Sequence, residues 1–163
     1  MKNLYVFAAI FMVSAWLGSC KKSETPACNL SSPPSVVAPA SEITAVDNYI
    51  NANSLTATQH SSGLFYNITA GTASGNKPGQ CSAVTINYRG MLTNGTVFDQ
   101  TTTPATFYLY DLIAGWRIGL PLITAGQSIR LYIPPSLGYG SQQAGSVPPN
   151  SILIFDISLQ SIQ

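Results

Sequence analysis

Residues 84–100 read V-T-I-N-Y-R-G-M-L-T-N-G-T-V-F-D-Q and carry the clearest secondary-structure pattern of the chain. Val84, Ile86 and Tyr88 alternate with polar residues, which is the two-residue period of a half-buried strand. Asn94-Gly95 is a strong signal for a tight hairpin turn, because both residues tolerate positive φ. The stretch therefore predicts two antiparallel strands joined by a turn. It ends on one carboxylate, Asp99, among apolar neighbours, and the rest of the chain must explain that acid.

Further strands are predicted on both sides of this hairpin. Short runs of β-branched, aromatic and aliphatic residues between turn-rich segments mark four of them, at residues 64–68, 107–109, 127–133 and 152–159. One short helix is predicted at 112–120, where Ile113, Trp116 and Leu120 share a face and Pro121 ends the pattern. We therefore expect an α+β fold, with an antiparallel twisted β-sheet of five to six strands wrapped around one short α-helix.

A second, N-terminal helix is predicted before the first strand. Ser41 is a candidate N-cap, and Ile43, Val46 and Ile50 form one apolar stripe that ends before the polar run 51–54. A helix that formed a dimer interface would need a longer apolar stripe than this one. We therefore expect this helix to pack on its own domain, and we expect a monomer.

The composition limits the function of the chain. Its 163 residues suffice for one ordinary domain, and 45% hydrophobic residues with few charges favour a packed globule. Seven basic and six acidic residues give no basic footprint for nucleic acid. The chain also lacks a long basic run, so a polybasic membrane anchor is not expected.

The first forty residues are expected to lie outside the fold. Residues 1–19 combine a basic start with an apolar run that is shorter than the ~20 residues of a membrane-spanning helix. The run ends in L-G-S-C, which resembles a bacterial lipobox and predicts a lipoprotein signal peptide with lipidation at Cys20. An ordinary secretory signal, with Cys20 incidental, is the alternative. Residues 20–40 are rich in Pro and Ser and are expected to form an extended tether.

Two cysteines remain, Cys28 and Cys81. An exported chain lies where disulfides persist, so we expect a Cys28–Cys81 bond; two free thiols are the alternative. The single histidine, His60, is not near either cysteine in the sequence. A Cys/His nucleophile pair and a His-Cys metal site are therefore poorly supported, and we expect neither a metal nor a cofactor.

Four separated blocks, in the right order, resemble the FKBP-type peptidyl-prolyl cis-trans isomerases. They are the opening stretch, P-A-T-F-Y-L-Y-D-L-I-A-G-W at 104–116, A-G-Q-S-I-R-L-Y-I-P-P-S-L-G-Y-G at 125–140, and V-P-P-N-S-I-L-I-F-D-I-S-L at 147–159. The preceding helix and S-S-G-L-F-Y resemble the bacterial secreted branch, which includes macrophage infectivity potentiator proteins. The resemblance implies an isomerase domain at 62–163, preceded by a short helical extension at 41–61.

The resemblance also implies a proline pocket. Trp116 would form its floor, and the backbone N–H of Ile113 and the hydroxyl of Tyr139 would donate hydrogen bonds to substrate carbonyls. The acid of the opening stretch, Asp99, is expected to be a buried or half-buried group that is hydrogen-bonded to Tyr139 or to a neighbouring donor. A turn-capping aspartate is the alternative for it. The substrate-binding residues would be Tyr88, Phe98, Leu112, Val147 and Phe155.

Three departures from the family pattern bear on activity. Ala105 replaces an aromatic wall residue of many eukaryotic members, and Gly138 replaces the alanine of the usual A-Y-G. The loop from Tyr139 to Pro148 is about one residue shorter than in the best-known small members. These departures leave substrate preference and affinity for the family's macrolide inhibitors open.

The resemblance implies a prolyl isomerase that assists the folding of exported or envelope proteins. Rotation about a peptide bond has a barrier of ~18–20 kcal/mol because resonance must be broken. No covalent bond forms or breaks, so an apolar pocket with placed hydrogen bonds suffices. The partners of such an isomerase would be proline-containing polypeptides. Through lipidated Cys20 it would also bind a membrane of the bacterial envelope. A non-catalytic FKBP-fold chaperone that binds such segments is the alternative, and Ala105 and Gly138 favour it.

Overall fold

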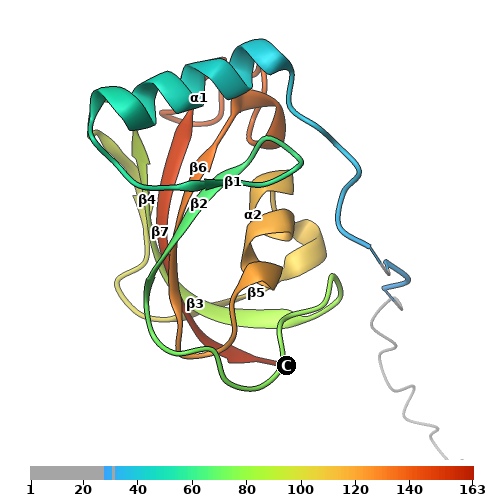
Figure 1. Cartoon of the computed structure of the whole chain (residues 1–163). Helices are drawn as coiled ribbons and strands as arrows, with labels where there is room; N and C mark the ends of the chain where they lie inside the picture. The colour runs from blue at the N-terminus through green and yellow to red at the C-terminus, as the bar shows by residue number, and fades with distance from the viewer. Residues whose placement is uncertain (1–27, 31) are drawn as a thin grey trace, which may run out of the picture.

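A computed structural model describes residues 28–30 and 32–163 of the chain (Figure 1). The predicted signal peptide, Cys20 and most of the predicted tether lie outside these described residues. Within them, no helix has both the length and the apolar character needed to cross a membrane. The same residues contain no group of three or more His, Cys, Asp or Glu side chains that could hold a metal ion.

One antiparallel sheet forms most of the domain, as predicted, but it has seven strands. The additional strand is the two-residue β1, which is too short to leave a periodic pattern in the sequence. The order is β1-β2-β6-β7-β3-β4, and β5 pairs with β3. The strands are β1 (Thr58–Gln59), β2 (Phe65–Ala70), β3 (Ala83–Leu92), β4 (Val97–Gln100), β5 (Ala105–Tyr108), β6 (Ser128–Ile133) and β7 (Leu153–Ile162).

The predicted hairpin is present. Strands β3 and β4 pair in antiparallel register, with Gly90 opposite Asp99. Gly95 has a φ of +84°, which explains why the turn needs glycine. Strand β3 also pairs with β5 and β7, so β3 contacts three other strands.

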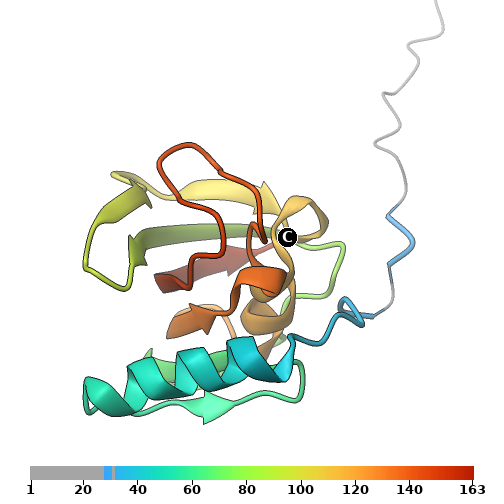
Figure 2. The same cartoon turned by 90° about the horizontal axis from the view of Figure 1, so that it is seen from above.

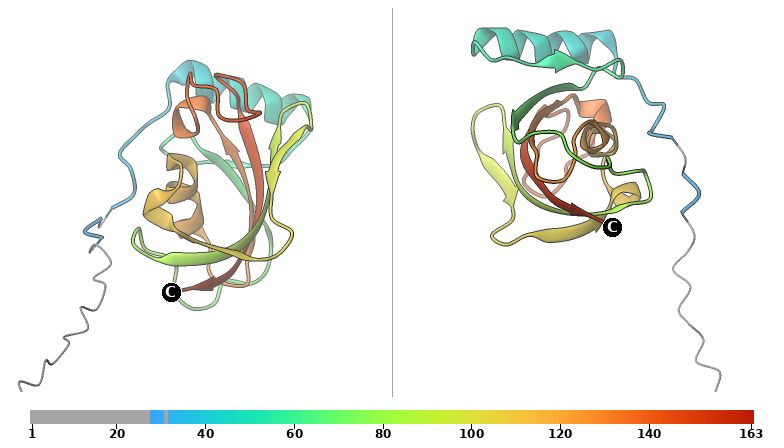
Figure 3. Two further views of the ribbon diagram at one scale, coloured as in Figure 1. Left: turned by 180° about the vertical axis from the view of Figure 1, so that it is seen from behind. Right: turned by 60° about the horizontal axis from the view of Figure 1, so that its bottom comes forward.

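Helix α2 (Ala114–Gly119) lies inside the curl of the sheet, as the end-on view in Figure 3 shows. It is shorter than the predicted 112–120, because Ile113 is its N-cap and the chain continues into a 3-10 turn, η2 (Leu120–Leu122). A second 3-10 turn, η1 (Leu109–Asp111), follows β5. Helix α2 packs closely on β6: a Cβ on Gly115 would lie 2.6 Å from Ile133, so only glycine permits this approach.

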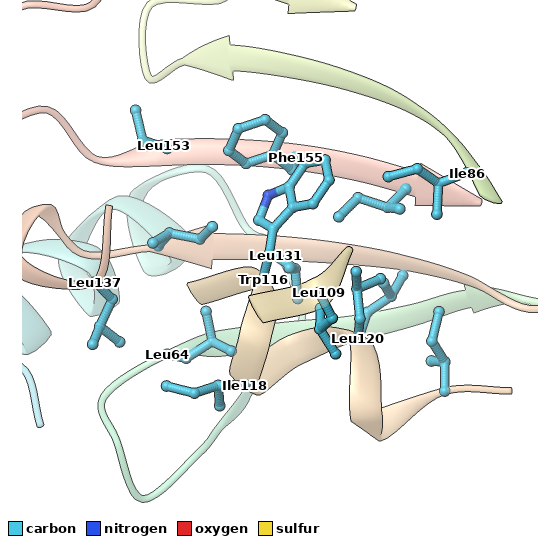
Figure 4. Close-up of a cluster of buried hydrophobic side chains, with 14 of the residues drawn as sticks. Leu64, Ile86, Leu109, Trp116, Ile118, Leu120, Leu131, Leu137, Leu153 and Phe155 are labelled. Carbon is cyan, nitrogen blue, oxygen red and sulfur yellow. The ribbon is translucent and has the colours of Figure 1, made fainter. Parts of the chain in front are cut away.

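The main core fills the space between α2 and the concave face of the sheet (Figure 4). Alternation along β6 and β7 supplies it: Ile129, Leu131 and Ile133 are fully buried, and Phe155 of β7 is buried beside them. Trp116 of α2 points from the helix toward Phe155 in Figure 4. The buried apolar faces of helix and sheet therefore meet at the residues for which a pocket was predicted.

Helix α1 (Ala40–Ala52) packs on the outer face of the same sheet (Figure 2). Its predicted stripe is confirmed, since Val46 and Ile50 are buried against a second apolar cluster. That cluster consists of outward-facing residues of β2, β6 and β7: Phe65, Tyr132 and Ile154. The prediction of Ser41 as N-cap is wrong: Pro39 occupies that position, and no side chain of the described residues caps the helix.

A hydrogen bond and a disulfide add to this packing and join the N-terminal residues to the domain. The Glu42 carboxylate on α1 accepts a hydrogen bond of 2.8 Å from the backbone N–H of Ser136, in the 3-10 turn η3 (Pro135–Leu137). Cys28 and Cys81 form a disulfide with a Cα–Cα distance of 5.5 Å. The disulfide joins the start of the described chain to the residues just before β3.

Candidate functional site

A cavity of about 270 Å³ opens beside α2, between the helix and strands β3, β5 and β7. Seven of the residues predicted for the proline pocket line it: Tyr88, Asp99, Leu112, Ile113, Trp116, Tyr139 and Phe155. They come from positions more than sixty residues apart in the sequence, and the sheet topology brings them together.

Trp116 forms the apolar centre of the cavity wall. It is only 5% exposed, and its ring meets Phe155 edge to face at a centroid distance of 5.0 Å. Tyr88 meets the same indole at 5.1 Å, again edge to face. Such edge-to-face contacts are a favourable geometry for aromatic rings. A small apolar ring entering the cavity would therefore meet a surface of packed aromatic rings.

Ile113 places a backbone donor at the edge of this surface. As the N-cap of α2 it is extended, with φ −57° and ψ 153°, and its carbonyl accepts from Trp116 and Arg117. Within the described part of the chain, its own N–H donates no hydrogen bond. The N–H of Ile113 is therefore free to bind a ligand carbonyl.

Asp99 is hydrogen-bonded to Tyr88. The Tyr88 hydroxyl donates to Oδ2 of Asp99 over 2.6 Å, so the neighbouring donor is Tyr88 rather than Tyr139. The prediction that Asp99 is buried or half-buried is wrong, because Asp99 is exposed at the end of β4. Among the described residues its carboxylate accepts from no backbone N–H, which does not favour the turn-capping alternative. One carboxylate oxygen remains open to solvent or to a ligand.

The two tyrosine hydroxyls at the cavity remain protonated at neutral pH. Partial burial raises the pKa of Tyr88, and the hydrogen bond to Asp99 raises it further. Partial burial also raises the pKa of Tyr139, and the negative charge of Asp99 adds to this. Each hydroxyl therefore keeps its proton and can donate a hydrogen bond.

Tyr139 stands at the mouth of the cavity with 38% of its surface exposed. It follows Gly138, one of the departures from the family pattern. A Cβ on Gly138 would lie 2.9 Å from Cδ1 of the fully buried Leu153, closer than real Cβ contacts allow. An alanine at position 138 would therefore require the buried Leu153 side chain of β7 to move.

Two predicted residues do not reach the cavity surface. Phe98 is not among the lining residues, and its ring meets that of Phe155 edge to face at a centroid distance of 5.4 Å. Val147 is 3% exposed and belongs to the main core. Its sequence block lies close to the cavity, but its side chain points into the packed interior.

The sequence interpretation missed two residues that line the cavity, Phe107 and Asp111. Phe107 alternates with Thr106 and Tyr108 in β5, and that period could have assigned it to the inner face. Asp111 lies in the 3-10 turn η1 between strand and helix, where no periodic pattern indicates the direction of a side chain. Its position could be found only from the fold.

Comparison with known proteins agrees with this arrangement. The model of the family described as FKBP-type peptidyl-prolyl cis-trans isomerase matches residues 75–160, just over half of the chain. FkpA of Buchnera aphidicola is 49% identical over 49% of this chain and 33% of its own length. Outer membrane protein MIP of Legionella longbeachae is 44% identical over 63% of this chain and 45% of its own.

A solved structure shows the same fold. The crystal structure of Escherichia coli FkpA superposes with a TM-score of 0.68 at 32% identity, over 76% of this chain and 60% of that one. The chain spans less than half the length of the curated relatives described above. The match nevertheless includes strands β3 to β6, helix α2 and most of β7, which together carry the cavity. The chain therefore belongs to the FKBP-type peptidyl-prolyl cis-trans isomerase family.

Proposed function

We propose that the chain is a peptidyl-prolyl cis-trans isomerase of the bacterial cell envelope that assists the folding of exported proteins. The observation that carries the proposal is the cavity itself, which joins a buried indole and aromatic walls to hydrogen-bond donors at its edge. Its apolar surface suits a proline ring. Its substrates are proline-containing segments of unfolded polypeptides.

Isomerisation in such a cavity needs no nucleophile. An X-Pro bond has cis and trans states of similar energy, but uncatalysed exchange takes tens to hundreds of seconds. In the planar ground state the amide is strongly polar and well hydrated, whereas the twisted state loses conjugation. When the proline ring lies on Trp116, the imide loses water, and this loss costs less for the twisted state. The pocket therefore favours the transition state over the ground state.

Hydrogen bonds at the cavity edge hold the substrate backbone while the bond turns. The free N–H of Ile113 donates to one substrate carbonyl, and the protonated hydroxyl of Tyr139 donates to another. Asp99 fixes the ring of Tyr88 through their hydrogen bond. These fixed groups bind one part of the peptide and leave the prolyl bond free to rotate.

We propose in addition that residues 1–19 are a lipoprotein signal peptide and that lipidated Cys20 anchors the protein to a membrane. Residues 20–40 would form the tether, 41–61 the helical extension and 62–163 the isomerase domain. The name of the Legionella relative, an outer membrane protein, supports an envelope location. Mass spectrometry of Cys20 in the cell-purified protein would test the anchor, and an unmodified cysteine would contradict it.

A rate measurement tests the enzymatic proposal. The full chain, at catalytic concentration, is expected to accelerate cis-to-trans exchange in a Leu-Pro tetrapeptide, and Tyr139→Phe is expected to be slower. A matched control is Tyr66→Phe on β2, because Tyr66 does not line the cavity. If all three proteins suppress aggregation of a proline-free client and none accelerates exchange, the non-catalytic chaperone replaces the isomerase as the proposed function.

A further inference from the structure

The carbonyl of Arg117 lacks the hydrogen-bond donor that an α-helix normally supplies. In an α-helix each carbonyl accepts from the N–H four residues further along the chain. For Arg117 that residue is Pro121, which has no N–H. The N–H one residue earlier, on Leu120, donates to the carbonyl of Trp116 instead. The sequence therefore leaves an acceptor near the end of α2 that must find its donor outside the helix.

Gln80, in the loop that precedes β3, supplies this donor. Its amide Nε2 donates to the carbonyl oxygen of Arg117 over 2.9 Å. Its Oε1 accepts from Nε of the same arginine over 3.4 Å. A reversed amide would place oxygen against oxygen and N–H against N–H, so the two contacts together fix the direction of the amide. Gln80 is only 5% exposed, so its loss would leave the carbonyl without a donor in a place largely shielded from water.

The same loop holds the other end of the segment that lines the cavity. The backbone carbonyl of Ser82 accepts a hydrogen bond of 3.0 Å from the N–H of Leu109, where η1 begins. Residues 109–117 therefore start and end on hydrogen bonds to residues 80–82. Four residues that line the cavity lie between these two points: Asp111, Leu112, Ile113 and Trp116. The loop thus holds, at both ends, the part of the chain that carries the proposed donor N–H and the cavity floor.

The loop itself is closed by hydrogen bonds and cross-linked. The N–H of Ser82 donates to the carbonyl of Gly79 over 3.0 Å, and the N–H of Gly79 donates to Oγ of Ser82 over 3.2 Å. Cys81, between the two anchoring residues, forms the disulfide with Cys28. Because the loop is restrained in this way, it loses little further conformational entropy when it holds α2. It can therefore act as a fixed support for the helix.

The indole of Trp116 has no hydrogen bond of its own to set its position. Its Nε1 is buried and finds no acceptor among the described residues. The ring therefore takes its place from packing against Tyr88 and Phe155 and from the backbone of α2 that carries it. Selective binding of the twisted peptide needs the groups on α2 and the aromatic walls on β3 and β7 at fixed separations. A shift of α2 against the sheet would change those separations.

We propose that Gln80 is a positioning residue of the isomerase: by holding the carbonyl of Arg117, it fixes α2, and with it Trp116, against the aromatic wall of the cavity. The proposal rests on the proposed isomerase function of the same cavity. Gln80 does not line the cavity and acts only through α2. Its loss is therefore expected to slow isomerisation by a folded protein, although no contact with the substrate is removed.

The experiment measures kcat and KM of the full chain for a Leu-Pro tetrapeptide. Gln80→Met keeps the approximate size of the side chain and removes both hydrogen bonds. Gln80→Glu keeps the acceptor for the Arg117 side chain and removes only the donor to its carbonyl. We expect each variant to lower kcat/KM about 3- to 10-fold, as for one lost hydrogen bond, with most of the loss in kcat.

Gln127→Met is the matched control. Gln127 is likewise 5% exposed, and its Oε1 accepts from the backbone N–H and the hydroxyl of Thr124. These hydrogen bonds lie outside residues 109–117. The control therefore removes buried hydrogen bonds of the same kind and should lower stability in the same way, but kcat/KM of the folded protein should equal that of the wild type. All rates are measured well below the unfolding midpoint of each variant.

Near-UV circular dichroism gives a readout that does not depend on turnover. The chain has two tryptophans, Trp16 and Trp116, and Trp16 is common to every variant. A difference spectrum between variant and wild type, in the tryptophan bands, therefore reports how firmly the indole of Trp116 is held. We expect a loss of tryptophan signal for both Gln80 variants and none for Gln127→Met.

The outcomes separate the two proposals. If the wild type is active and the Gln80 variants match Gln127→Met in both kcat/KM and tryptophan signal, the positioning role is wrong and the isomerase proposal stands. If no protein accelerates exchange but the Gln80 variants alone lose the tryptophan signal and bind the peptide more weakly, the isomerase proposal fails and the positioning role stands. A Gln80→Glu protein with wild-type kcat/KM would overturn the role of the bond to the carbonyl, also where Gln80→Met does not fold.

Discussion

The hydrogen bond between Tyr88 and Asp99 joins strands β3 and β4 at the cavity edge. Asp99→Asn keeps an acceptor oxygen but weakens this bond, and Tyr139→Phe removes a donor from the mouth. We expect each change to lower kcat/KM for a Leu-Pro peptide roughly 3- to 10-fold, as for the loss of one useful hydrogen bond. Because both residues are exposed, the free energy of unfolding should change by less than about 1 kcal/mol. Urea denaturation and peptide exchange assays would check this, and a loss of stability without loss of rate would contradict the assignment.

The raised pKa of Tyr88 predicts a pH dependence of stability. The folded protein holds this proton more tightly than the unfolded chain, whose tyrosine pKa is about 10. The contribution is therefore fully present below pH 10 and is lost as the pH rises above it. Tyr88→Phe removes the titrating group, so the stability difference between wild type and Tyr88→Phe should shift against the wild type between pH 9 and pH 11. A difference in unfolding free energy between wild type and Tyr88→Phe that does not change with pH would contradict this prediction.

At the scale of the element, helix α1 supports the turn that precedes Tyr139. Glu42 accepts from the N–H of Ser136, three residues before Tyr139, and Ile50 packs in the outer apolar cluster. Glu42→Ala is expected to cost about 1–2 kcal/mol and to lower kcat/KM through a less ordered turn. Glu42→Gln keeps an acceptor oxygen, so it should retain most of the wild-type stability and most of the wild-type kcat/KM. Asn48→Ala, an exposed change on the same helix, is the control, and an equal effect of both alanine variants would contradict this role.

The Cys28–Cys81 disulfide links residues that are 53 positions apart. A cross-link of this span restricts the unfolded chain, so its loss is expected to cost about 2–4 kcal/mol of unfolding free energy. Urea denaturation with and without a reductant measures this, and the Cys28→Ser/Cys81→Ser double variant provides the matched protein that a reductant should not affect. Identical midpoints for oxidised and reduced wild type would show that the link does not stabilise the domain.

The elements with a clear period were predictable, and those without one were not. The hairpin with Asn94-Gly95, the alternating strands and the apolar stripe of α1 were all predicted from the sequence. Strand β1 was not, because two residues carry no period. Ser41 was assigned as N-cap because its residue type suits that position, but the helix begins earlier, after Pro39.

At the scale of the whole molecule, the curl of the sheet around α2 creates the cavity. Seven pocket residues were named from the family resemblance, but their shared surface depends on β3, β5 and β7 lying beside α2. Asp111 was missed because a 3-10 turn aims it there, and the burial of Val147 follows from its place in the core. The exposure of Asp99 likewise follows from its place at the end of β4. Tertiary packing, rather than a local sequence pattern, therefore determines whether each of these three side chains is exposed or buried and where it lies.

The central claim is that the cavity floored by Trp116 accelerates prolyl isomerisation. Its most direct test is the rate of cis-to-trans exchange in a Leu-Pro tetrapeptide as a function of the concentration of the full chain. We expect the exchange rate to rise linearly with protein concentration at substoichiometric amounts, and we expect a proline-ring competitor to suppress it. A rate equal to the uncatalysed background at every concentration, from protein that is shown to be folded, would contradict it.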